Sequence, residues 1–139
     1  ARAPTELERH RFLEGGFRVV HDYFADGLQQ LAGSEGVETD LVDIHARKFV
    51  CSVFVGGDRA ATGKIWTGGF GTGEQISYCE DITRVDEDNS FNDWLGIKRD
   101  ELAWEPGAFG LRNDAKGPFT HEEGARYLWQ ALITQLDRR

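Results

Sequence analysis

Residues 5–32 read TELERHRFLEGGFRVVHDYFADGLQQLA, and this segment decides the fold. Thr5 and Glu8 have the spacing of a capping box, in which each side chain accepts a hydrogen bond from the other residue's backbone N–H, so we expect a helix to begin there. Apolar side chains then recur every three or four residues, at Leu13, Phe17, Val20, Phe24, Leu28 and Leu31. A helix with one apolar stripe needs a partner surface, and we expect a sheet.

Three glycines, Gly15, Gly16 and Gly27, lie inside this helical pattern. Each one destabilises a helix relative to alanine by roughly 1 kcal/mol. We therefore expect a kink near Gly15, two helices in place of one, or a neighbouring element that approaches the glycines closely. Gly33 is a plausible stop for the helix.

Residues 37–55 are rich in β-branched and aromatic side chains, and the pattern alternates most clearly from Phe49 to Val55. The Gly-Gly-Asp-Arg sequence at residues 56–59 tolerates positive φ, which predicts a hairpin into an antiparallel strand at about residues 61–67. Further strands are expected at residues 75–79 and near residues 101–105, where Leu102 and Trp104 would share a face. Between them, Ser90 and Asp93 are candidates to cap one helical turn.

Thr120 and Glu123 form a second capping box, followed by a broad apolar stripe at Leu128, Trp129, Leu132, Ile133 and Leu136. The sequence thus predicts one α+β domain over residues 1–139. It comprises a long N-terminal helix, an antiparallel sheet of four to five strands, and a C-terminal helix packed on the sheet beside the first. The chain has no methionine even at position 1, so we expect a domain excised from a larger protein or a processed chain.

Twenty-four acidic and sixteen basic residues leave a net charge of −8, which opposes binding to a nucleic-acid backbone or an anionic membrane surface. No run approaches the roughly 18 apolar residues that a membrane helix needs. We expect a cytoplasmic protein with a small-molecule or protein partner, or a homo-oligomer, and with no nucleic-acid or membrane partner. The four histidines show no pair at metal-ligand spacing, so no metal or cofactor is expected.

The segment WTGGFGTG, residues 66–73, holds four glycines in six positions. Such a backbone can approach a ligand closely and present N–H groups to an anion. Alternatively, the segment is a flexible hairpin connection, because it leads toward a strand and not into a helix as phosphate-binding loops do. As a ligand site it would comprise Lys64, Trp66, Gly69, Phe70, Gly71 and Gly73. In that case Lys64 would serve the ligand and contribute little to stability.

Residues 86–90 open like a calcium loop, but Phe91 and Ile97 stand where that loop needs glycine and glutamate. A solvated acidic loop is the preferred interpretation.

Cys51 and Cys79 are expected to be buried thiols, with a disulfide as the alternative if their strands are neighbours. Five aromatic residues are expected either in the core or around one pocket or patch: Trp66, Tyr78, Trp94, Trp104 and Trp129.

No serine lies in a nucleophile elbow and neither cysteine has the local signature of an activated thiol. A catalytic site would have to assemble across the sheet, with Asp43, His45 and Glu80 as the candidates.

Four runs, FVCSVFV (49–55), KIWTGG (64–69), NSFN (89–92) and ARYLW (125–129), resemble accessory domains attached to bacterial TIR-type signalling and defence proteins. The resemblance implies a non-catalytic domain that senses a ligand or mediates assembly, while an attached effector performs the chemistry. Our leading hypothesis is a non-enzymatic ligand-binding or sensor module. The alternatives are a protein-interaction or oligomerisation domain and, third, a small hydrolase.

Overall fold

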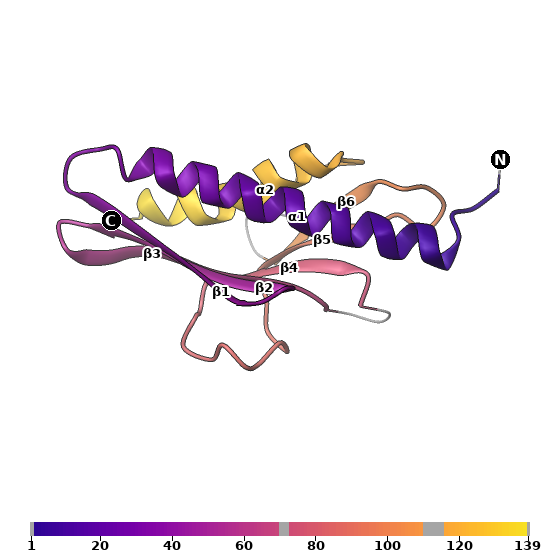
Figure 1. The fold of residues 1–139 in the computed structure, drawn as a ribbon, viewed down its shortest axis with the longest axis horizontal. Helices are drawn as coiled ribbons and strands as arrows, with labels where there is room; N and C mark the ends of the chain where they lie inside the picture. Colours follow the sequence, from indigo (N-terminus) through magenta and orange to yellow (C-terminus); the bar gives the residue numbers. More distant parts are fainter. Residues whose placement is uncertain (1, 70–72, 110–115, 139) are drawn as a thin grey trace.

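The computed structural model describes residues 2–69, 73–109 and 116–138 (Figure 1). Its helices and strands follow one another in the order α1 (Glu6–Leu31), β1 (Val37–His45), β2 (Lys48–Val55), β3 (Asp58–Thr67), β4 (Gln75–Cys79), β5 (Asp93–Ile97), β6 (Trp104–Ala108) and α2 (His121–Leu136). The α+β class with a helix at each end is confirmed. Neither helix is both long and apolar enough to cross a bilayer, within the described ranges.

The strands form one antiparallel sheet in which each strand pairs with its neighbour in sequence, in the order β1-β2-β3-β4-β5-β6. The described residues thus form six strands, so the expected four to five was too few. Residues 37–55 are two strands joined by a tight turn at His45–Lys48, because the alternation of apolar residues stops at this polar stretch. Residues 93–97 are β5 and not a helical turn, because Leu95 pairs with Ile76 of β4 and is fully buried.

The last strand is displaced from its expected position. It begins at Trp104 instead of ending just beyond it. Leu102 precedes the strand and is 41% exposed, whereas Trp104 is fully buried. The two side chains therefore do not share a buried face, and that expectation was wrong.

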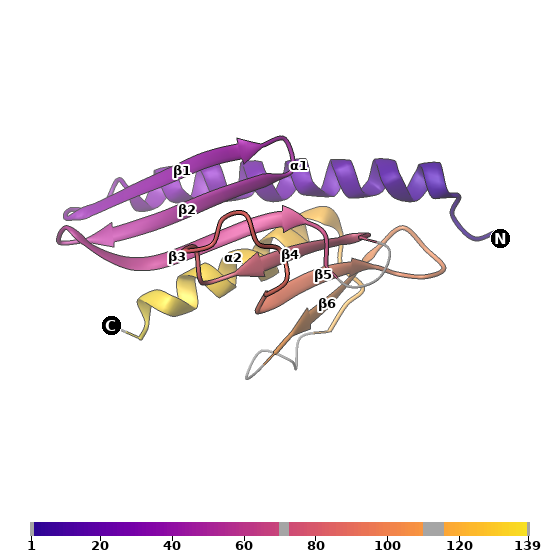
Figure 2. The same cartoon turned by 90° about the horizontal axis from the view of Figure 1, so that it is seen from below.

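Both helices lie on the same face of the sheet (Figures 1 and 2), as their apolar stripes predicted. Both capping boxes are present, with Thr5 and Thr120 as the N-cap residues. The α1 helix is continuous through its glycines. Of the three alternatives, the close approach of neighbouring side chains to these glycines is the one observed. A Cβ on Gly16 would lie 2.5 Å from the Trp104 ring, and one on Gly27 would lie 2.7 Å from the Trp129 ring.

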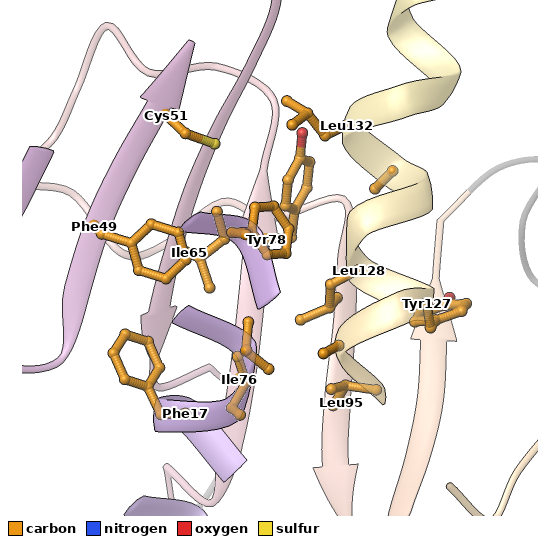
Figure 3. Packing of buried hydrophobic residues seen from close by; sticks show 14 of the residues in the cluster. Phe17, Phe49, Cys51, Ile65, Ile76, Tyr78, Leu95, Tyr127, Leu128 and Leu132 are labelled. Atoms are coloured by element: carbon orange, nitrogen blue, oxygen red, sulfur yellow. The ribbon is translucent and has the colours of Figure 1, made fainter. Parts of the chain in front are cut away.

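The main core fills the space between the helices and this face of the sheet (Figure 3). Phe24 of α1 and Leu132 of α2 are both fully buried in it. Phe24 and Phe17 pack against Phe49 of β2, with ring centroids 5.6 and 5.7 Å apart. Burial of the two helix stripes against the sheet is thus the main apolar contribution to stability.

The opposite face of the sheet carries a second, smaller cluster, in which Trp66, Cys79 and Phe91 are buried and Trp94 packs against them. The loop between β4 and β5, residues 80–92, lies against this face (Figure 1). Cys51 belongs to the main core and Cys79 to the second cluster. Both cysteines are buried and free, and they lie on opposite faces of the sheet, so the disulfide alternative was wrong.

Two buried lysines attach this loop to the sheet. The Lys48 ammonium donates to the Val85 carbonyl at 2.9 Å and to an Asp88 carboxylate oxygen at 2.6 Å. The Lys64 ammonium donates to the Arg84 carbonyl at 3.0 Å and to the Glu87 carbonyl. The acidic side chains are exposed, as expected of a solvated loop, but its backbone is held to the sheet by specific polar contacts.

Candidate functional site

A cleft of about 410 Å³ lies between α1 and the turn that joins β1 to β2. This volume falls within the usual range of small-molecule sites, roughly 300–1,000 Å³. Its walls combine apolar, acidic and basic side chains and are made by Leu13, Glu14, Phe17, Arg18, His21, Asp43, His45, Ala46, Arg47 and Thr67.

Local structure explains how these residues meet. Glu14, Arg18 and His21 are spaced by four and three residues, so the helix aligns them beside its buried stripe. The β1–β2 register shifts between Asp43 and His45, where the hairpin bends. The Thr67 N–H donates to the Arg47 carbonyl at 3.1 Å. The helix, the turn and the end of β3 therefore enclose one site.

His21 connects the two walls. Its Nε2 lies 2.8 Å from an Asp43 oxygen and its Nδ1 lies 3.1 Å from an Asp22 oxygen. The ring packs edge-on against Phe49, with centroids 5.1 Å apart. The imidazole thus ties α1 to β1 and occupies the Asp43 carboxylate.

The second acid of the cleft also has a histidine partner, because Glu14 lies 2.7 Å from His10 Nε2. In contrast, the guanidinium groups of Arg18 and Arg47 have no hydrogen bond or ion pair within the part of the chain that the structure describes. His45 Nδ1 accepts the Arg47 N–H at 3.1 Å, which leaves Nε2 of the neutral ring as a donor. The unused polar groups of the cleft are therefore mainly cations and donors.

The comparisons with known proteins give a family. Residues 38–134 match the Y4lF protein domain. The chain belongs to this family. No curated protein and no solved structure matches it. The matched residues of this Y4lF domain run from β1 into α2, so they include the turn side of the cleft, while α1 precedes them.

The ligand site expected from the sequence is only partly accessible in the Y4lF domain. Lys64 is 2% exposed and Trp66 is 1% exposed. The Lys64 ammonium lies 4.7 Å from the Trp66 ring centroid and is occupied by the loop carbonyls. Lys64 therefore supports the fold, contrary to the expectation that it contributes little to stability. The Trp66 Nε1 donor is buried with no hydrogen-bond partner among the described residues.

The Gly-rich segment itself is described at both ends. Gly69 is exposed, and Gly69 and Gly73 have φ values of 155° and 81°, which glycine adopts readily. Phe70 and Gly71 lie outside the described residues. Thr67, the second residue of the segment, lines the cleft, and ligand contact by the glycines that follow it stays a prediction.

The structure does not bring together the two other groups of residues that the sequence suggested, the catalytic candidates and the five aromatic residues. Asp43 and His45 both line the cleft, but Glu80 does not, and it forms an ion pair with Arg138 at 3.0 Å. The five aromatic residues divide between the faces of the sheet: Tyr78, Trp104 and Trp129 pack with the main core, Trp66 and Trp94 with the second cluster. Within the described ranges, no group of three His, Cys, Asp or Glu side chains could hold a metal ion.

Arg18 and Arg47 are the residues that sequence reasoning missed. Arg18 lies among glutamates on α1 and reads as part of an ordinary solvated helix face. Arg47 lies in a turn and belongs to no local motif. Their shared environment exists only because β1 packs against α1, which brings the β1–β2 turn beside the helix.

Proposed function

We propose that this Y4lF domain is a non-enzymatic binding module that takes a small anionic ligand in the cleft between α1 and the β1–β2 turn. One observation carries the proposal: both acids of the cleft have histidine partners, while neither arginine has a partner among the residues that the structure describes. Guanidinium groups bind carboxylate and phosphate with paired, charge-assisted hydrogen bonds. In a chain with a net charge of −8, two unpaired arginines on the walls of one cleft form a local exception that favours an anion.

The remaining lining describes the rest of the ligand. Leu13 and Phe17 contribute apolar side chains to the lining of the cleft, which suits an organic anion with an apolar body. His45 Nε2 and the Thr67 hydroxyl can direct further hydrogen bonds. A carboxylate or phosphate joined to a compact organic group therefore matches the volume and the chemistry of the cleft.

The cleft also suits a sensor. Its two walls belong to α1 and to the β1–β2 turn, so a ligand held by Arg18 and Arg47 would strengthen the connection that His21 and Asp43 already make. The resemblance to accessory domains of bacterial TIR-type proteins supports a cytoplasmic role in which ligand binding regulates an attached effector in signalling or defence.

The test is a thermal melt of the domain, monitored by Trp fluorescence, in the presence of each candidate ligand. The candidates are dicarboxylates, sugar phosphates, nucleotides and cyclic nucleotides, and neutral sugars are the uncharged comparison. An anion at about 100 times its dissociation constant should stabilise the domain by roughly 2.7 kcal/mol. Arg18→Ala and Arg47→Ala should each weaken that binding at least about tenfold, as expected for loss of a charge-assisted hydrogen bond.

Arg126→Ala is the matched control, because Arg126 is exposed on α2 and does not line the cleft. It should leave the affinity unchanged. The proposal fails if only neutral sugars bind, or if an anion binds equally well to the Arg18, Arg47 and Arg126 variants.

A further inference from the structure

The two edges of the sheet are treated differently. At the β6 edge, Trp104 and Phe119 exchange backbone hydrogen bonds of 2.9 and 2.8 Å, so the chain covers part of its own edge. At the opposite edge, β1 is the outermost strand (Figure 2). Among the described residues, the one backbone bond on its outer side joins the Val37 N–H to the Ser34 carbonyl at 3.2 Å. The nine-residue β1 strand is therefore open for pairing along most of its length.

The hydrogen-bond ladder shows which groups are available. The Gly56 N–H donates to the Gly36 carbonyl at 2.9 Å, so the even-numbered residues of β1 are the ones hydrogen-bonded to β2. Bonding alternates along an antiparallel strand. The N–H and C=O groups of Thr39, Leu41 and Asp43 consequently point outward, away from β2.

The side chains on the exposed face of β1 have a definite order. The Thr39 hydroxyl donates to the Leu28 carbonyl of α1, so odd-numbered side chains face the helix. Glu38, Asp40 and Val42 face the other way, and Val42 is 47% exposed. An added strand would meet these three residues at non-hydrogen-bonded pairs, where opposing side chains approach most closely.

We propose that β1 binds an extended, basic segment of a partner protein as an additional antiparallel strand. Read from its N-terminus, the segment has the pattern apolar-x-basic-x-basic. In the antiparallel direction this places an apolar side chain opposite Val42, then Lys or Arg opposite Asp40 and Glu38. Backbone hydrogen bonds to the outward groups supply affinity, and the alternate side chains supply specificity.

Charge complementarity selects this occupant over a second copy of the chain. A second β1 would bring another acidic strand, and another net charge of −8, to the same edge. Like charges in adjacent strands are destabilising, whereas opposite charges in cross-strand pairs are stabilising. The same acidic residues oppose unselective pairing between edges of this protein, so they discriminate between partners.

The probe is a short threonine-rich peptide that carries Ile, Lys and Lys at alternate positions, compared with a scrambled peptide of the same composition. We expect saturable binding of the peptide with this residue order, measured by fluorescence anisotropy. Slowed hydrogen exchange should appear at the amides of Thr39, Leu41 and Asp43. The scrambled peptide should bind more weakly and protect none of these amides.

A charge-swap experiment tests the register. The double variant Glu38→Lys/Asp40→Lys should bind the lysine peptide about tenfold more weakly, because two attractive cross-strand pairs become repulsive. It should gain affinity for the counterpart peptide with Glu at both positions. The control Asp86→Lys/Glu105→Lys changes the net charge equally at exposed positions away from β1 and should retain the lysine peptide.

Equal weakening in the control variant would reduce the effect to unselective electrostatics and overturn the proposal. Absence of saturable binding at about 1 mM peptide would also overturn it. So would light scattering that shows a dimer broken by the β1 variant, since the edge would then be occupied by a second copy. Glu38 and Asp40 do not line the cleft, so this proposal and the anion-binding proposal fail independently.

Discussion

The two faces of the sheet are covered by different means. One face lies beneath α1 and α2 and is joined to them by a cluster of buried, almost entirely apolar side chains. Part of the other face lies beneath an irregular loop whose backbone carbonyls are held by the ammonium groups of Lys48 and Lys64. Apolar burial is non-directional and adds up over many contacts, whereas the loop depends on a few oriented hydrogen bonds. The faces should therefore respond differently to single substitutions.

The largest effect is expected on the helix face. Phe24→Asp or Leu132→Asp would place an unpaired carboxylate at a fully buried position. The free-energy cost of removing that carboxylate from water exceeds the free energy of unfolding of a domain of this size. Each variant should lose its cooperative unfolding transition, measured by circular dichroism and Trp fluorescence. Gln29→Asp, at an exposed position of α1, should still unfold cooperatively. Cooperatively folded Phe24 and Leu132 variants would contradict the described core.

An intermediate effect is expected on the loop face. Lys64→Met keeps most of the buried aliphatic chain but leaves the Arg84 and Glu87 carbonyls without their donor. We expect a loss of about 1–3 kcal/mol in the free energy of unfolding, with the domain still folded. Hydrogen exchange should accelerate within residues 80–92.

The matched control for this prediction is Lys116→Met, because Lys116 is exposed. Its effect should stay within about 0.5 kcal/mol. If both lysine variants unfolded at the same denaturant concentration as the parent, the loop would not depend on the Lys64 ammonium.

The smallest effect is expected from a polar contact on the helix face of the sheet, the hydrogen bond between Trp104 and His121. His121 Nδ1 accepts the Trp104 Nε1–H at 2.9 Å, and burial lowers the pKa of His121 below its ordinary value. The unfolded chain therefore binds this proton more readily, so the free energy of unfolding should fall as the pH drops from about 7 toward 5.

His121→Asn is the comparison for this pH dependence, since its amide oxygen can still accept from Trp104. Denaturant unfolding at several pH values should show a shallower pH dependence for the variant. Identical profiles for the two proteins would assign the pH dependence to other groups.

The helices were predictable because their signals are local. The capping boxes at Thr5 and Thr120 place each helix start, and three- and four-residue spacing identifies the buried faces. The strand at residues 75–79 was also located directly. The β1–β2 turn was missed although its signal is local, since the polar residues at 43–48 interrupt the apolar alternation. β5 was missed because a short run such as residues 93–97 has no period of its own to distinguish strand from turn, so its assignment depends on its pairing with β4.

The candidate site shows the same division. The sequence draws attention to the glycines after Trp66, because glycine carries a local conformational signal. It shows neither that the Lys64 ammonium is bonded to loop carbonyls nor that the Arg18 and Arg47 guanidinium groups lack partners within the described part of the chain. Whether a charged group is free is settled only when every nearby group has taken its position.

The sequence by itself determined the α+β class, the two helices with their buried stripes and the antiparallel run of strands, because capping and hydrophobic periodicity act between residues close in the chain. Only the tertiary structure decided which strand is the open edge, how the loop is held, and which charges line a cleft without partners. These properties depend on contacts between segments far apart in sequence, and packing selects those contacts where local patterns do not.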